Sequence, residues 1–146
     1  MKNIWLLQQI IMQRLLAWGF LSVVVGLVLL PINAFWRGFG TQAIGWGGID
    51  AVIAIGGGWF LRRRRARLLN PNDPTQLTRE AGNLRRLLWF NAFLDVFYVL
   101  GGLVLVLVRG AKDKAWSGHG WGIMVQAGFL FFFDLIHALL VPKEQS

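Results

Sequence analysis

Four long apolar segments dominate this sequence and restrict it to folds that a lipid bilayer can hold. Each approaches the roughly 20 apolar residues that a membrane-spanning helix needs. Because lipid offers the backbone no hydrogen-bond partners, each segment must be helical. With the flanking residues that continue the pattern, we expect helices at about 4–30, 43–61, 74–108 and 121–141.

The composition agrees with a membrane protein of one domain. Hydrophobic residues make up 55% of the 146 residues and charged residues 15%, against roughly 25% charged in a typical soluble domain. A small soluble domain must cover a large surface with polar side chains, whereas a lipid-facing surface needs no such cover. We therefore predict an all-α membrane protein over residues 1–146, with four transmembrane helices packed as a bundle.

The basic residues are divided unequally between the two ends of such a bundle. If all four segments cross the membrane, 11 of the 15 fall on the side of the termini and the loop 62–86. The positive-inside rule then places both termini and this loop in the cytoplasm. We expect a multi-pass protein of the inner cell membrane.

A run of arginines follows the second apolar segment. Nucleic-acid binding usually adds stacking aromatic side chains and a suitable module; neither is evident, so we expect no nucleic-acid partner. Basic clusters beside a spanning helix are typical of contacts with anionic lipid headgroups. The residues that we assign to headgroup binding are Arg62, Arg63, Arg64, Arg65 and Arg67.

The second and fourth segments share one spacing of polar and small residues. Gln42-Ala43, Asp50 and Ala54 recur at identical intervals as Gln126-Ala127, Asp134 and Ala138. The pattern predicts two duplicated helix hairpins in the same orientation, related by a pseudo-twofold axis along the membrane normal. Chance similarity is the alternative, because apolar segments use few residue types.

Two stretches of these segments resemble an uncharacterised bacterial family of small four-span integral membrane proteins. They are Trp46-Gly47-Gly48-Ile49-Asp50 and Gln126 through Asp134. Both are short and cover a small part of the chain. The resemblance implies the four-helix fold and no particular activity.

Three carboxylates lie inside apolar segments, on the second, third and fourth. A charged side chain at the centre of a spanning helix costs about 3 kcal/mol on insertion scales, so such residues normally face the protein interior. Helical spacing places Asn91 and Tyr98 on the face of Asp95, and His137 beside Asp134. We expect a core that binds or moves a small polar solute, ion or proton, lined by Asp50, Asp95, Asp134, Asn91, Tyr98, Gln42, Gln126 and His137.

Other functions stay open. If these polar groups only join helices by hydrogen bonds, the chain is a non-catalytic accessory or assembly subunit of a larger membrane complex, as its many glycines and aromatic residues also favour. No catalytic set of serine, histidine and acid is evident, so an enzyme is disfavoured, although a lipid-modifying enzyme that uses aspartates and arginines stays open. Because four helices barely enclose a solute path, we expect a homo-oligomer or other membrane subunits.

We expect no cofactor and no metal site. The chain has no cysteine, which excludes thiolate metal sites and thiol catalysis. His119 and His137 fall near opposite membrane boundaries and cannot ligate one haem iron together. A haem or pigment held by one histidine stays open.

Overall fold

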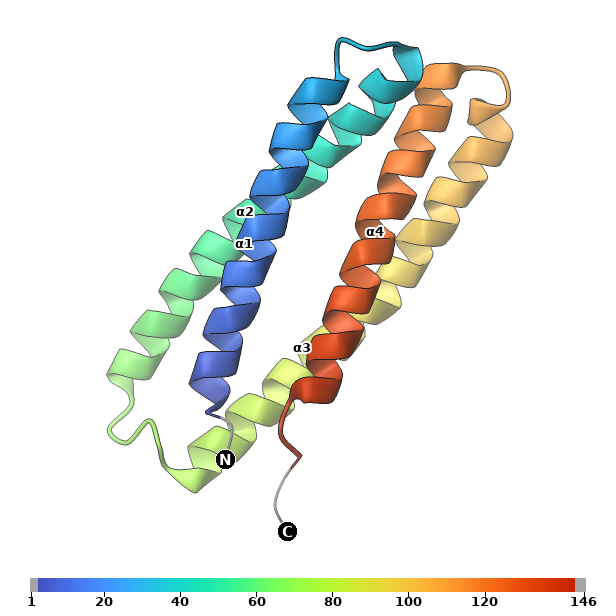
Figure 1. Cartoon of the computed structure of the whole chain (residues 1–146). Coiled ribbons are helices and arrows are strands. Elements are labelled where there is room, and N and C mark those ends of the chain that lie inside the picture. Colours follow the sequence, from blue (N-terminus) through green and yellow to red (C-terminus); the bar gives the residue numbers. More distant parts are fainter. Residues whose placement is uncertain (1–2, 144–146) are drawn as a thin grey trace.

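The computed structural model describes residues 3–143, which form four long helices (Figure 1). These are α1 (Ile4–Leu29), α2 (Ala34–Arg67), α3 (Pro74–Leu105) and α4 (Lys114–Leu140), and a π-helical turn, η1 (Val106–Gly110), extends α3. All four are long and apolar enough to cross a membrane. The predicted all-helical bundle with four candidate spans is confirmed.

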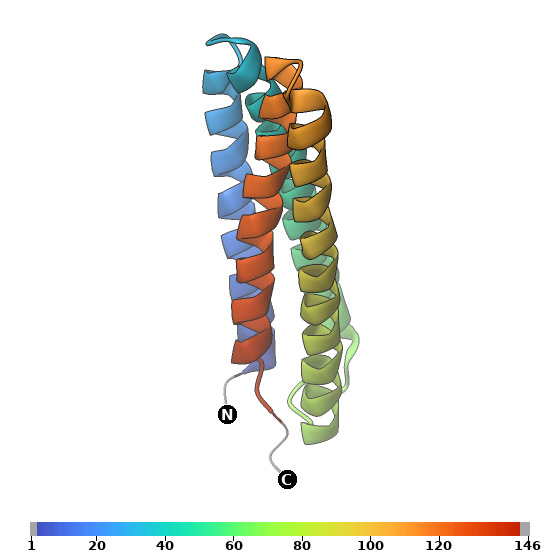
Figure 2. The same ribbon diagram turned by 90° about the vertical axis from the view of Figure 1, so that its right-hand side faces the viewer.

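The start of α1 and the end of α4 lie at one end of the bundle, which we call the terminal end (Figures 1 and 2). The link 68–73 lies there too, whereas the links 30–33 and 111–113 lie at the opposite end. The chain therefore runs up and down as two hairpins, α1–α2 and α3–α4.

Polar side chains cap the N-termini of α2 and α4, and both helices begin before their apolar segments. At the start of α2 the Asn33 side chain accepts a hydrogen bond of 3.0 Å from the backbone N–H of Trp36. At the start of α4 the Asp113 side chain accepts one of 2.8 Å from the backbone N–H of Ala115. Each cap satisfies a backbone donor that the helix cannot, so α2 and α4 begin well before the positions expected from apolar residues alone.

Glycines let the two helices of each hairpin touch through their backbones. A Cβ atom on Gly47 would lie only 2.6 Å from the carbonyl oxygen of Gly19, and one on Gly102 would lie 2.8 Å from that of Gly120. A larger side chain would force the helices apart. Small residues are the usual means by which spanning helices approach closely.

The two hairpins meet where α2 crosses α4 near the opposite end. A Cβ atom on Gly38 would collide with the backbone of Ala115, and one on Gly118 would collide with the backbone of Phe35. The contact is reciprocal, because the counterparts lie 80 positions apart in both directions. α2 and α4 form the central pair, and α1 and α3 have only a small contact with each other.

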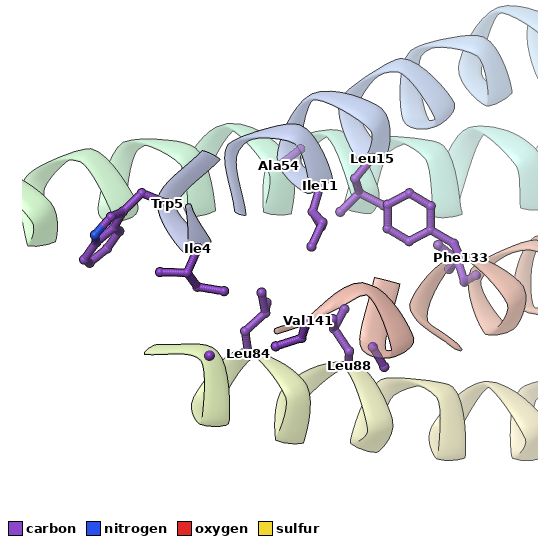
Figure 3. Packing of buried hydrophobic residues seen from close by; sticks show 12 residues of the cluster. Ile4, Trp5, Ile11, Leu15, Ala54, Leu84, Leu88, Phe133 and Val141 are labelled. Atoms are coloured by element: carbon purple, nitrogen blue, oxygen red, sulfur yellow. The ribbon is translucent and has the colours of Figure 1, made fainter. Parts of the chain in front are cut away.

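A cluster of buried apolar residues lies toward the terminal end and joins all four helices (Figure 3). Its members include Leu15 of α1, Ala54 of α2, Leu88 of α3 and Phe133 of α4. An ion pair of 2.6 Å between Arg64 of α2 and the buried Glu80 of α3 adds a polar tie at this end. Apolar packing and the Arg64–Glu80 ion pair therefore hold the two hairpins together near the terminal end.

Replacing Gly47 by alanine should destabilise the protein by about 1–3 kcal/mol, because the added methyl group overpacks the contact with Gly19. The matched control is Gly45→Ala on the same helix, where nothing lies within 4 Å of the added Cβ. That control should be neutral or stabilising by up to about 1 kcal/mol through helix propensity. Thermal unfolding in detergent measures both, and equal effects would contradict the close α1–α2 contact.

Candidate functional site

Three aspartates on three different helices are buried inside the bundle. Asp50 of α2 is 4% exposed, Asp95 of α3 is 5% exposed and Asp134 of α4 is 7% exposed. Each helix turns its acid away from the face that carries its large apolar side chains, since lipid cannot solvate a carboxylate. The expectation that these acids face the protein interior is confirmed.

The three carboxyl groups also lie near one another. Asp95 and Asp134 face each other within hydrogen-bonding reach. Asp50 lies close enough for electrostatic interaction with both. The packing of α2 and α3 against α4 thus gathers residues that are distant in the sequence into one acidic cluster.

This cluster lacks the partners that buried acids usually have. Within residues 3–143, no lysine, arginine or histidine forms an ion pair with any of the three; the ion pair found there is Arg64–Glu80. The Oδ2 atoms of Asp50 and Asp95 are buried without a hydrogen-bond partner. Buried polar atoms are nearly always satisfied, and within residues 3–143 the Gln8 Oε1 atom is the other buried side-chain atom without a partner. The two carboxylate oxygens therefore make the aspartate cluster the candidate site.

Gln126 belongs to a separate buried network that joins α4 to α1. Its Oε1 atom accepts a hydrogen bond of 3.0 Å from the Trp18 indole, and its amide donates to the Ser22 hydroxyl at 3.3 Å. The Trp18 ring also stacks on Phe129, with centroids 3.5 Å apart. Gln126 lies eight residues before Asp134, which is about 12 Å along the helix.

His137 lies three residues after Asp134 and is held by two partners. Its Nδ1 atom is 2.6 Å from the carbonyl oxygen of Phe133, and Arg14 of α1 lies 3.0 Å from Nε2. A carbonyl oxygen only accepts and a guanidinium only donates, so the ring donates through Nδ1 and accepts through Nε2. The Arg14 charge is therefore directed at a histidine and not at the acids.

The remaining predicted site residues do not complete a shell around the acids. Gln42 is hydrogen-bonded to His119 at 3.1 Å, toward the opposite end. The Tyr98 ring is 45% exposed and packs edge-on against Trp46. Asn91 is half-buried, one turn before Asp95.

Sequence reasoning did not assign Trp18, Ser22 or Arg14 to the site, although these side chains provide the polar contacts from α1. Two signals were available in the sequence. Trp18 lies too deep in its segment for an interfacial tryptophan, and Arg14 interrupts an apolar helix. Neither signal names a partner on α4, which only the packing of the hairpins supplies.

The predicted headgroup arginines divide into two groups. Three have partners within the chain: Arg64 pairs with Glu80, Arg63 lies 4.0 Å above the Trp59 ring, and Arg65 lies 6.0 Å from the Trp5 ring. Arg62 and Arg67 are exposed.

The part of the chain that the structure describes contains no group of three or more histidine, aspartate or glutamate side chains arranged to hold a metal ion. A hollow of about 460 Å³ lies at the opposite end, lined by Asn33, Trp36, Gly110 and Lys114 among others. None of the three aspartates lines this hollow, which is therefore a separate feature.

The four candidate spans and the inward-facing acids place the chain in the class of multi-pass α-helical membrane proteins. Within that class, the chain belongs to a family of unknown function, DUF6992, whose model matches residues 14–135. The matched region includes all three aspartates. Neither a curated protein nor a solved structure matches the chain.

Asp95→Asn should preserve or raise the stability of the protein, because the amide can donate a hydrogen bond to Asp134 without a proton being bound to either carboxyl group. Gln126→Leu should lower stability by about 0.6–1.7 kcal/mol, as for other interhelical hydrogen bonds in membranes. Thermal unfolding of both variants in one detergent provides the comparison. If Asp95→Asn were the more damaging change, the acidic pair itself would be holding the helices together.

Proposed function

We propose that this protein binds a small polar solute, ion or proton at the aspartate cluster and moves it across the membrane. The supporting observation is that Asp50, Asp95 and Asp134 are buried together, with no basic partner among residues 3–143. Three ionised carboxylates in an apolar bundle would be very costly. A species from outside the chain that neutralises them would remove this cost.

The location of the cluster also favours transport. The acids lie where α2 and α3 approach α4, so the cluster is shared between the two hairpins. Many transporters place their site between two structural halves that rock about it. A movement of the α1–α2 hairpin against the α3–α4 hairpin would alter access to the acids from each side.

Transport requires a defined orientation, and we place the terminal end in the cytoplasm. The sequence predicts a loop at 62–86, but this segment comprises the end of α2, the link 68–73 and the start of α3. This segment and the termini carry most of the cations, which the positive-inside rule keeps on the cytoplasmic side. The exposed Arg62 and Arg67 would contact anionic headgroups, and Arg63 and Arg65 would do so from above their tryptophan rings.

The orientation is testable because the chain has no cysteine. A membrane-impermeant maleimide should label Lys112→Cys in intact cells and Asn72→Cys only in inverted membrane vesicles. Both positions are exposed, so accessibility depends on the side of the membrane. The reverse labelling pattern would place the terminal end outside.

We also propose that the two hairpins arose by duplication. The reciprocal contact of Gly38 and Gly118 supports this, because it relates residues 80 positions apart. The spacing of Gln42 and Asp50 matches that of Gln126 and Asp134 at a distance of 84, one helical turn different. The glycine register, with Trp36 and Trp116 also 80 apart, is the better candidate for the ancestral alignment.

A role as an accessory subunit is the second candidate. It is favoured by glycines on outward faces, such as Gly45, Gly48 and Gly101, where an added Cβ would meet nothing within 4 Å. A helix of a second copy or of another membrane subunit would fit closely there. In that case the native protein would co-purify with a stoichiometric partner.

Purified protein in liposomes should show solute-dependent flux that Asp50→Asn abolishes, because the site would lose a charge that it needs. A panel of protons, Na⁺ and K⁺ provides the probes. Asp73→Asn is the matched control, since Asp73 lies in the link before α3 and its side chain makes no capping hydrogen bond. Unchanged flux in the folded Asp50→Asn variant would refute a transport site at the aspartate cluster. No flux of protons, Na⁺ or K⁺ with the wild-type protein would favour the accessory-subunit role.

A further inference from the structure

The direct approach of two carboxyl groups in the acidic cluster restricts the class of ligand that it can bind, provided that the proposed binding function holds. Asp95 and Asp134 direct their carboxyl groups at each other. An ionised carboxylate has only acceptor atoms. Two ionised carboxylates at this separation would repel each other and could form no hydrogen bond.

One proton resolves this conflict. If one of the two groups is protonated, its O–H donates to the other, and the pair carries a single negative charge. Paired aspartates that share one proton behave in this way in other proteins, because like charges at such close range cannot both ionise. The buried and unpartnered Oδ2 atom of Asp95 is consistent with this assignment, since no other donor from residues 3–143 reaches it.

Asp50 provides a second position for a proton. Its Oδ2 atom is also buried and has no donor, and its carboxyl group lies within electrostatic range of both other acids. Within residues 3–143 no basic side chain forms an ion pair with it. Arg14, a cation within α1, donates to His137 instead, and His137 accepts that bond through a ring nitrogen.

We propose that the species bound at the cluster is a proton, held between Asp95 and Asp134, with Asp50 as the alternative acceptor. Binding forms one O–H bond on a carboxylate oxygen, and release returns that proton to water with the carboxylate regaining its charge. No bond of the protein chain is made or broken, and no electron is transferred.

Infrared spectroscopy tests the bound state directly. The wild-type protein should show the C=O stretch of a protonated buried carboxylic acid, with a shift on exchange into D₂O. This band should shift in frequency or weaken in Asp95→Asn and in Asp134→Asn, because each variant breaks the shared pair, and it should stay unchanged in Asp73→Asn. If the band is absent from the wild-type spectrum, or is unchanged in both cluster variants, the proton assignment is overturned.

Flux measurements separate this inference from the proposed function. Liposomes loaded with a pH-sensitive dye and given a K⁺ diffusion potential should acidify with wild-type protein, and Asp134→Asn should reduce the rate to that of protein-free liposomes. Flux of Na⁺ or K⁺ without protons would overturn the proton assignment and leave the transport proposal standing. A carboxylic acid band without flux of any probe would support the bound proton and refute transport.

Discussion

Direct backbone contact between α2 and α4 is the constraint on which the rest of the arrangement depends. These helices cross at Gly38 and Gly118, where even a methyl group would collide with the facing backbone. Van der Waals packing of this kind is the main attraction available between helices in lipid, where there is no hydrophobic driving force between them. The crossing fixes the register of the central pair and so brings Asp50 and Asp134 within electrostatic range.

The bundle reverses the distribution of side chains found in a soluble protein. Large apolar side chains such as Phe20, Val52 and Leu139 are about two-thirds exposed, and a bilayer would cover them. The polar groups are inside, where Gln126 joins α4 to Trp18 and Ser22 of α1. Because lipid cannot replace a lost hydrogen bond, these polar groups must find their hydrogen-bond partners inside the protein.

The chain carries a formal charge of +8, yet within residues 3–143 its three buried aspartates have no basic partner. Several basic side chains contact other groups instead. Arg64 pairs with Glu80, and Arg85 donates a hydrogen bond of 2.6 Å to the carbonyl oxygen of Pro142, just after α4. Arg14 contacts His137. Long basic side chains therefore tie the helices together toward the terminal end, and the aspartates are left as a separate acidic site.

The sequence by itself determined the number of helices, the position of the apolar part of each and the burial of the three aspartates, because lipid forces apolar segments into helices and acids inward. It did not determine the full lengths of α2 and α4, which extend beyond their apolar parts. Only the tertiary structure decided which polar groups meet: it paired Gln42 with His119, left Tyr98 half exposed and added Trp18 and Arg14 from α1. Helical periodicity defines the faces of one helix, but the partners across a bundle depend on crossing points and register, which arise from packing between helices.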